Sequence, residues 1–148
     1  MEHVTVPVTG GDLFVARWGS GPPGLAGHGI TGSHAAWSWV ADRLAGAVSL
    51  IAPDLRGRGA SNGLPGPFGM AAHAADLVAV LDHLEVTWAV VVGHSMGGTA
   101  VSLYAATHPG VAESVTLVEG LGPPAFDGQA PDKARTWLDS MDRFWRRE

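Results

Sequence analysis

The most constraining feature of the sequence is the stretch VVVGHSMGG at residues 90–98. Its β-branched valines predict a buried strand, and the small residues of 96–107 predict a helix. Between them, Gly93 and Gly97 flank Ser95 in the spacing G-x-S-x-G, which is typical of a sharp strand-to-helix turn that exposes a serine hydroxyl at a sheet edge. Both glycines are needed there, because a Cβ at either position would strike neighbouring backbone. The alternative is that the two glycines only join a strand to a helix.

The rest of the sequence places this turn in an α/β fold. Alternating valines and the pair Gly10-Gly11 predict a hairpin near the N-terminus. Later strands are predicted at 24–26, 48–53, 86–93 and 114–120, the last one buried, and helices at 34–46, 70–84 and 96–107. Strands that alternate with helices predict a mostly parallel, twisted sheet with helices on both faces.

Composition narrows the class of protein further. The 148 residues are enough for one domain, and 46% hydrophobic with 16% charged residues argues against disorder. A net charge of −5 gives no reason to expect nucleic acid or an anionic membrane as partner. The chain has no cysteine, no signal-like start and no apolar run long enough to span a bilayer. We therefore expect a cytoplasmic protein with no cofactor, no metal and no membrane partner.

A second candidate segment, His28-Gly29-Ile30-Thr31, follows the predicted third strand. Acyl transfer requires two backbone N–H donors directed at the developing oxyanion, one from the residue after the nucleophile and one from a loop after the third strand. In this interpretation Met96 and Ile30 supply the two amides. The side chain of His28 is expected to be structural and hydrogen-bonded within its loop.

Two groups of charged residues are better explained by structure than by chemistry. Asp54, Arg56 and Arg58 could suggest an anion-binding loop, but the glycines around them lack phosphate-loop spacing. A tight, charge-paired loop is the prediction. His73 and Asp76 lie three residues apart on one predicted helix and could contact a metal, but no third ligand has a useful spacing. These two are predicted to lie on a solvated face.

The motifs HGIT, DLRGRGAS, GHSMGG and VTLVEGLGPP, in this order, resemble the α/β-hydrolase superfamily in its esterase-like branch. The resemblance covers about residues 4–124. It implies a serine hydrolase that acts on small-molecule esters or related acyl substrates, with Ser95 as nucleophile and the amides of Ile30 and Met96 as oxyanion hole. Serine stands where haloalkane dehalogenases and epoxide hydrolases carry aspartate, which favours ester, lactone or thioester substrates.

A serine nucleophile also needs a general base and a third group that orients the base. In this family the order along the chain is serine, acid, histidine. After Ser95 the only histidine is His108, which is predicted at the far end of the helix that Ser95 begins. Glu119 is a candidate acid by its place after the predicted strand at 114–120. The alternative is that Glu119 hydrogen-bonds a neighbouring loop at the rim.

The missing base leads us to expect the N-terminal part of a longer hydrolase. Residues 1–124 would form the core without its last two strands, and residues 125–148 would start a helical cap or lid. We expect little turnover from this chain alone, and self-association through the unpaired strand at 114–119 and the C-terminal helix. The alternatives are a non-catalytic module that binds a small ligand or a partner, and completion by a second polypeptide. The predicted cap helix has an apolar stripe of Trp137, Leu138, Met141, Phe144 and Trp145.

Overall fold

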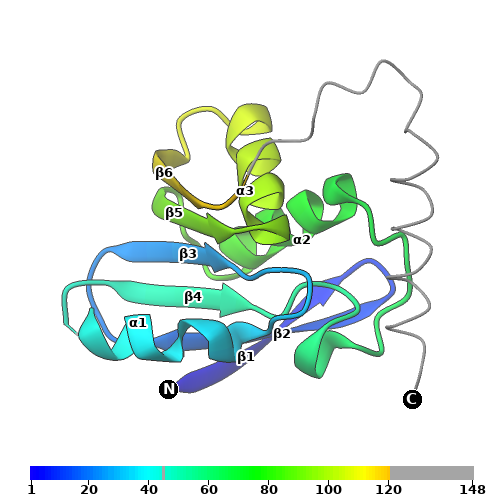
Figure 1. The fold of residues 1–148 in the computed structure, drawn as a ribbon, viewed down its shortest axis with the longest axis horizontal. Coiled ribbons are helices and arrows are strands. Elements are labelled where there is room, and N and C mark those ends of the chain that lie inside the picture. Colours follow the sequence, from blue (N-terminus) through cyan, green and yellow to red (C-terminus); the bar gives the residue numbers. More distant parts are fainter. Residues whose placement is uncertain (45, 121–148) are drawn as a thin grey trace.

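A computed structural model describes residues 1–44 and 46–120 and shows a six-stranded sheet with helices on both faces (Figure 1). The elements in chain order are β1 (Glu2–Val8), β2 (Gly11–Trp18), β3 (Pro23–Gly27), η1 (His34–Trp37), α1 (Ser38–Arg43), β4 (Ser49–Pro53), η2 (Gly59–Ser61), α2 (Met70–His83), β5 (Ala89–His94), α3 (Met96–Thr107) and β6 (Ala112–Val118). Every predicted strand and helix within this range is present, and the helix predicted over 34–46 is divided into η1 and α1. The predicted cap segment at 125–148 lies outside the described residues.

The strand order is β1-β2-β4-β3-β5-β6, with antiparallel pairs up to β4 and parallel pairs from β4 to β6. The predicted mostly parallel sheet is therefore confirmed. Parallel strands have their carboxyl ends at one edge, and β3 lies directly beside β5 in the middle of the sheet (Figure 1). The loop after β3 and the turn after β5 are consequently neighbours at that edge, where ligands of open α/β sheets bind.

Successive strand residues face opposite sides of the sheet and build two cores. Leu25 and Ile51 point into a large core that α2 and α3 cover. Their neighbours Ala26 and Leu50 pack on the other face against Trp37 at the start of α1. Strands such as β4, buried at every position, are therefore apolar throughout rather than alternating.

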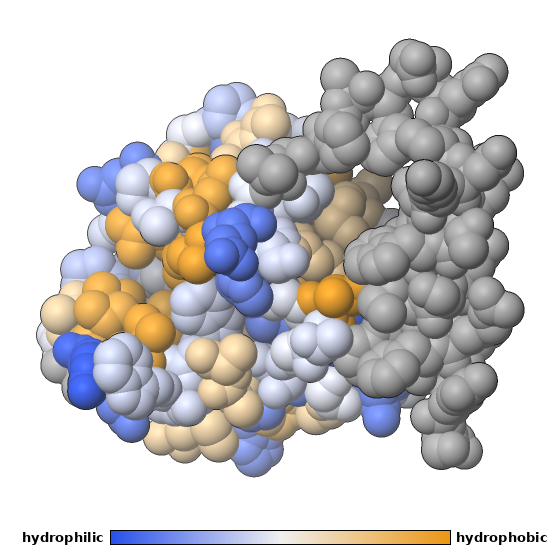
Figure 2. All heavy atoms as spheres, in the orientation of Figure 1, coloured by the Kyte–Doolittle hydropathy of each residue, from blue (hydrophilic) through white to orange (hydrophobic). Residues whose placement is uncertain are grey.

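The last strand, β6, is exposed, so the prediction that it is buried is wrong. From Glu113 to Val118 every residue is exposed, including Val115 at 41%, Leu117 at 44% and Val118 at 45%. One edge of β6 pairs with β5, and the other edge pairs with no described strand. Figure 2 shows hydrophobic surface at the upper left, over the part of the molecule where Figure 1 places β5 and β6.

We propose that the 148-residue chain self-associates through this edge, since an open edge strand with apolar side chains pairs readily with another chain. Sedimentation velocity over a concentration series is expected to show oligomers that Leu117→Lys reduces, because a charge would be buried in the contact. Ala71→Lys, an exposed position on α2, serves as the control and should leave the oligomers unchanged. A monomer at every concentration would contradict the proposal.

Candidate active site

The turn that carries Ser95 connects β5 directly to α3. Ser95 has φ 51° and ψ −117°, a region that residues with a side chain rarely occupy and that costs about 1–3 kcal/mol. Hydrogen bonds hold this conformation on both sides: the Ser95 amide donates to the Val118 carbonyl at 3.0 Å, and the Ser95 carbonyl accepts from the Thr99 amide at 3.2 Å. The spacing G-x-S-x-G therefore forms the sharp turn that it predicts.

The two glycines that flank Ser95 allow close backbone contact. A Cβ on Gly93 would lie 2.5 Å from the Cα of Gly98 and 2.6 Å from the carbonyl oxygen of Gly97. A Cβ on Gly97 would collide with the carbonyl oxygen of Gly27, in the strand next to β5. The predicted need for both glycines is confirmed, because in each case the atoms in the way belong to backbone.

The loop after β3 lies against the serine turn. Its first residues form a turn in which the Gly32 amide donates to the Gly29 carbonyl at 2.9 Å. A Cβ on Gly29 would lie 2.9 Å from His94 Nδ1 and 3.6 Å from the Cβ of Ser95. Ile30 is the second residue of this turn, so its amide takes no part in the bond that closes the turn. The loop that carries Ile30 therefore lies beside the serine turn.

The side chain of His28 is structural, as predicted. It is fully buried, with Nδ1 2.7 Å from the Gly29 carbonyl and Nε2 accepting from the Leu55 amide at 2.9 Å. This pattern requires a neutral ring, with the proton on Nδ1 donated to the carbonyl. Burial lowers the pKa of His28, which favours the same neutral form. His28 therefore ties the loop after β3 to the loop after β4.

The second proposed oxyanion donor, Met96, is the first residue of α3. A first-turn amide has no acceptor within its own helix, and the positive end of the helix dipole lies at the same place. Such an amide suits a developing negative charge.

The candidate acid, Glu119, directly follows β6. Because Val118 pairs with His94, Glu119 lies level with Ser95, one residue beyond the end of the adjacent strand. Its side chain is exposed, its φ is 52°, and it makes no hydrogen bond or ion pair with another described residue.

Two histidines, His94 and His108, are near Ser95 in the sequence, and they lie in different places in the structure. His94 is exposed, and its ring covers Gly29 beside the serine turn. His108 caps the far end of α3, which at twelve residues spans about 18 Å. Among residues 1–44 and 46–120, no hydrogen bond joins the Ser95 hydroxyl to a histidine.

The charged loop after β4 is paired, as predicted, and its partners lie in other elements. Asp54 is fully buried and accepts from His34 Nδ1 at 2.9 Å, from the His34 amide and from the Ala60 amide at 2.7 Å. Arg56 forms two bonds to Asp76 on α2, from Nε at 2.9 Å and from Nη2 at 2.6 Å. Sequence analysis missed the His34–Asp54 pair, because no local pattern connects residues twenty positions apart.

The prediction that His73 and Asp76 lie on a solvated face is wrong. Their exposed fractions are 0% and 3%, because the loop that carries Arg56 and Arg58 folds over this side of α2. Neither ring nitrogen of His73 has a hydrogen-bond partner among the described residues. The pKa of His73 is lowered to about 4. Burial of the ring is the largest cause, and repulsion by the positive charge of Arg58 is the second.

This buried His73 predicts a loss of stability in acid. The unfolded chain binds a proton on His73 below pH 6.5, whereas the folded chain binds it only near pH 4. The free energy of unfolding should therefore fall as the pH drops from 6.5 to 4, by about 3 kcal/mol in total. Urea unfolding at pH 7, 6 and 5 should show this slope in the parent and a reduced one in His73→Leu, in which the buried His28 still contributes. The exposed His83→Leu on the same helix is the control, and an unchanged slope in His73→Leu would contradict the prediction.

A parallel sheet with a strained serine between strand and helix, facing a glycine loop from the adjacent strand, defines a hydrolase-type scaffold. Residues 26–148 match the alpha/beta hydrolase fold family, and the chain belongs to that family. Among the described residues, no helix is long and apolar enough to cross a membrane.

Three relatives illustrate the range of this family. Lipase LipV of Mycobacterium tuberculosis is 34% identical over 132 residues, which cover 88% of this chain and 48% of that protein. Epoxide hydrolase 2 of Siraitia grosvenorii is 37% identical over 100 residues, 66% of this chain and 32% of that protein. A solved structure, a thermophilic esterase from Thermogutta terrifontis, superposes with a TM-score of 0.83 at 27% identity, covering 99% of this chain and 54% of that one. The chain thus spans between a third and about half of these relatives.

Proposed function

We propose that this chain carries the nucleophile and the oxyanion-binding segments of a serine hydrolase that acts on carboxylic esters or related acyl compounds. The observation that carries the proposal is the backbone of Ser95, held at φ 51° between β5 and α3 and beside the Gly29–Gly32 turn. Backbone strain of this kind persists where function requires it and the surrounding structure supports it.

In the proposed reaction, the Ser95 hydroxyl oxygen attacks the acyl carbon, and its proton passes to a general base. The amides of Ile30 and Met96 stabilise the oxyanion of the tetrahedral intermediate. The intermediate collapses to an acyl-serine as the alcohol leaves with the proton from the base. Water then attacks the acyl-serine by the same route and releases the acid. Glu119, level with Ser95 just after the neighbouring strand β6, is the proposed acid that would orient the base.

The identity of the nucleophile favours acyl substrates over epoxides. Attack by serine on an epoxide would produce an ether, which has no carbonyl for water to attack, so the enzyme would remain alkylated. Attack on an ester produces an acyl-serine, which water can cleave. The likeness to a protein named lipase and to one named esterase supports this choice.

Labelling with a fluorophosphonate probe tests the nucleophile. We expect slow, stoichiometric labelling that Ser95→Ala abolishes, because the described residues place no base on the hydroxyl. Ser114→Ala, an exposed serine on β6, is the matched control and should label like the parent. Hydrolysis of p-nitrophenyl acetate should show little turnover.

Three results would oppose this proposal or the expectation of little turnover. Labelling that survives in Ser95→Ala would exclude Ser95 as the nucleophile, and rapid turnover dependent on Ser95 would show that the chain needs no further base. An unreactive Ser95 at every probe concentration would favour a non-catalytic module that binds a ligand or partner.

A further inference from the structure

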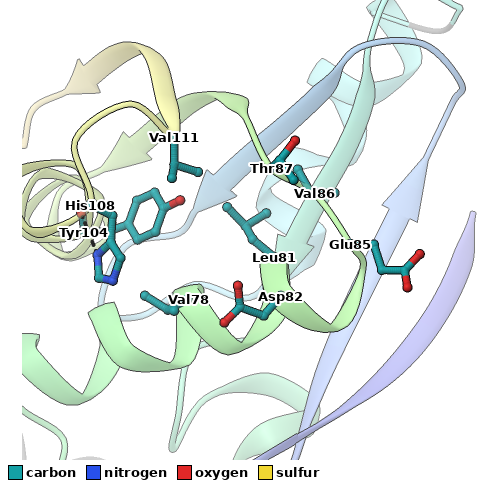
Figure 3. A pocket seen from close by; sticks show the side chains of 9 residues that line it. All are labelled: Val78, Leu81, Asp82, Glu85, Val86, Thr87, Tyr104, His108 and Val111. Atoms are coloured by element: carbon teal, nitrogen blue, oxygen red, sulfur yellow. Dashed lines mark hydrogen bonds between the residues drawn. The ribbon is translucent and has the colours of Figure 1, made fainter.

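A pocket lies at the amino edge of the sheet, away from Ser95. It occupies about 390 Å³ between the last turns of α2 and α3, the loop that leads into β5, and Val111 before β6 (Figure 3). This volume falls within the range of small-molecule sites. None of its lining residues belongs to the candidate active site, so what the pocket binds is independent of the proposed hydrolase function.

One polar group that lines the pocket is the hydroxyl of Tyr104. The residue is only 2% exposed, and Figure 3 shows its hydroxyl directed into the pocket between Val111 and Leu81. This hydroxyl forms no hydrogen bond with another described residue, and its oxygen is not fully buried, so solvent reaches it in the pocket. Because its oxygen faces the open space of the pocket, the hydroxyl is available to bond a ligand group that enters there. The ring of His108 stacks on Tyr104 with centroids 5.4 Å apart and holds the phenol in position.

The charge around the pocket is negative. Figure 3 shows the carboxylate of Asp82 on the wall opposite Tyr104 and directed inward, whereas Glu85 points away. The carboxyl ends of α2 and α3 both terminate here and add partial negative charge. No lysine or arginine occurs among the described residues that line the pocket. Burial, and then the charge of Asp82, raise the pKa of Tyr104, so the phenol keeps its proton.

We propose that this pocket binds a small organic amine in its protonated form. The ammonium group would bond the Asp82 carboxylate and the Tyr104 oxygen, two groups that face each other across the pocket. The apolar body of the amine would lie against Leu81, Val86 and Val111. A carboxylate ligand is disfavoured because it would meet Asp82 and two negative helix ends.

Isothermal titration of the chain with 2-phenylethylammonium tests the proposal. We expect saturable binding in the millimolar range or tighter, with 2-phenylethanol and 3-phenylpropionate binding about tenfold more weakly or not at all. Asp82→Asn should weaken amine binding about tenfold, because it removes the charge and keeps the shape. Tyr104→Phe, which removes one oxygen and preserves the packing, should weaken it several-fold.

Two further variants separate this site from the rest of the molecule. Asp42→Asn, an exposed carboxylate on α1, should bind the amine like the parent, and so should Ser95→Ala. The proposal is overturned if no saturable binding occurs, if Asp82→Asn and Asp42→Asn have equal effects, or if the alcohol binds as well as the amine. Circular dichroism of each variant confirms that the fold is retained, and none of these outcomes depends on whether Ser95 is a nucleophile.

Discussion

Asp76→Ala is expected to lower the free energy of unfolding by about 4 kcal/mol, because it leaves the Arg56 guanidinium buried without its carboxylate. The pair is almost fully buried, with side-chain exposures of 4% on both sides. Arg56 would keep its hydrogen bonds to the carbonyls of Thr9 and Pro65. These carbonyls accept from Nη1 of the guanidinium but do not neutralise its positive charge. Urea unfolding at pH 7 measures the loss, which is a large part of the stability of a typical domain.

The control for this prediction is Asp82→Ala, an exposed carboxylate on the same helix, which should change stability by less than about 0.5 kcal/mol. The double variant Arg56→Met with Asp76→Leu should recover much of the loss, since it replaces the buried charges with apolar groups of similar size. A small effect of Asp76→Ala would mean that water reaches Arg56 in solution.

The structural features that could be predicted from the sequence are those that depend on residues close together along the chain. The turn at Ser95 is an example, because valines, two glycines and a run of small residues specify strand, turn and helix within about fifteen residues. The edge of the sheet at which this turn lies can also be predicted, because parallel strands have their carboxyl ends at the same edge. The contact between Gly29 and Ser95 could therefore be expected from two separate motifs.

What could not be predicted depends on segments far apart in sequence. On α2, Asp76 and His73 have the polarity of a solvated face, and the helical pattern gives no sign that the loop of Arg56 covers them. Similarly, the apolar pattern of β6 predicts burial, whereas Val115 and Leu117 are exposed because β6 is the last strand of the sheet and the described elements leave these side chains largely uncovered. In both cases tertiary packing overrides the local pattern.

Gly97→Ala is expected to lower the free energy of unfolding at least as much as Asp76→Ala does, because the structure leaves no space for the new methyl group. It would overlap the carbonyl oxygen of Gly27 and lie 2.6 Å from that of His28. Both are backbone atoms of the segment that runs from β3 into the oxyanion loop, so no side-chain rotation relieves the overlap. We expect a loss of about 4 kcal/mol or more, and loss of fluorophosphonate labelling. Gly63→Ala is the control, because nothing lies within 4 Å of its added Cβ.

The comparison with Gly29→Ala separates a stability effect from an effect on the site. A methyl group on Gly29 would meet His94 Nδ1 at 2.9 Å, and His94 is an exposed side chain that can rotate away. Its cost in stability should therefore stay near 1 kcal/mol, while the methyl group, 3.6 Å from the Ser95 Cβ, narrows the space beside the hydroxyl and slows labelling. Adding His94→Ala should restore the stability of Gly29→Ala and leave Gly97→Ala unchanged. If Gly29→Ala and Gly97→Ala lower the free energy of unfolding equally, backbone movement must relieve the collision with Gly27.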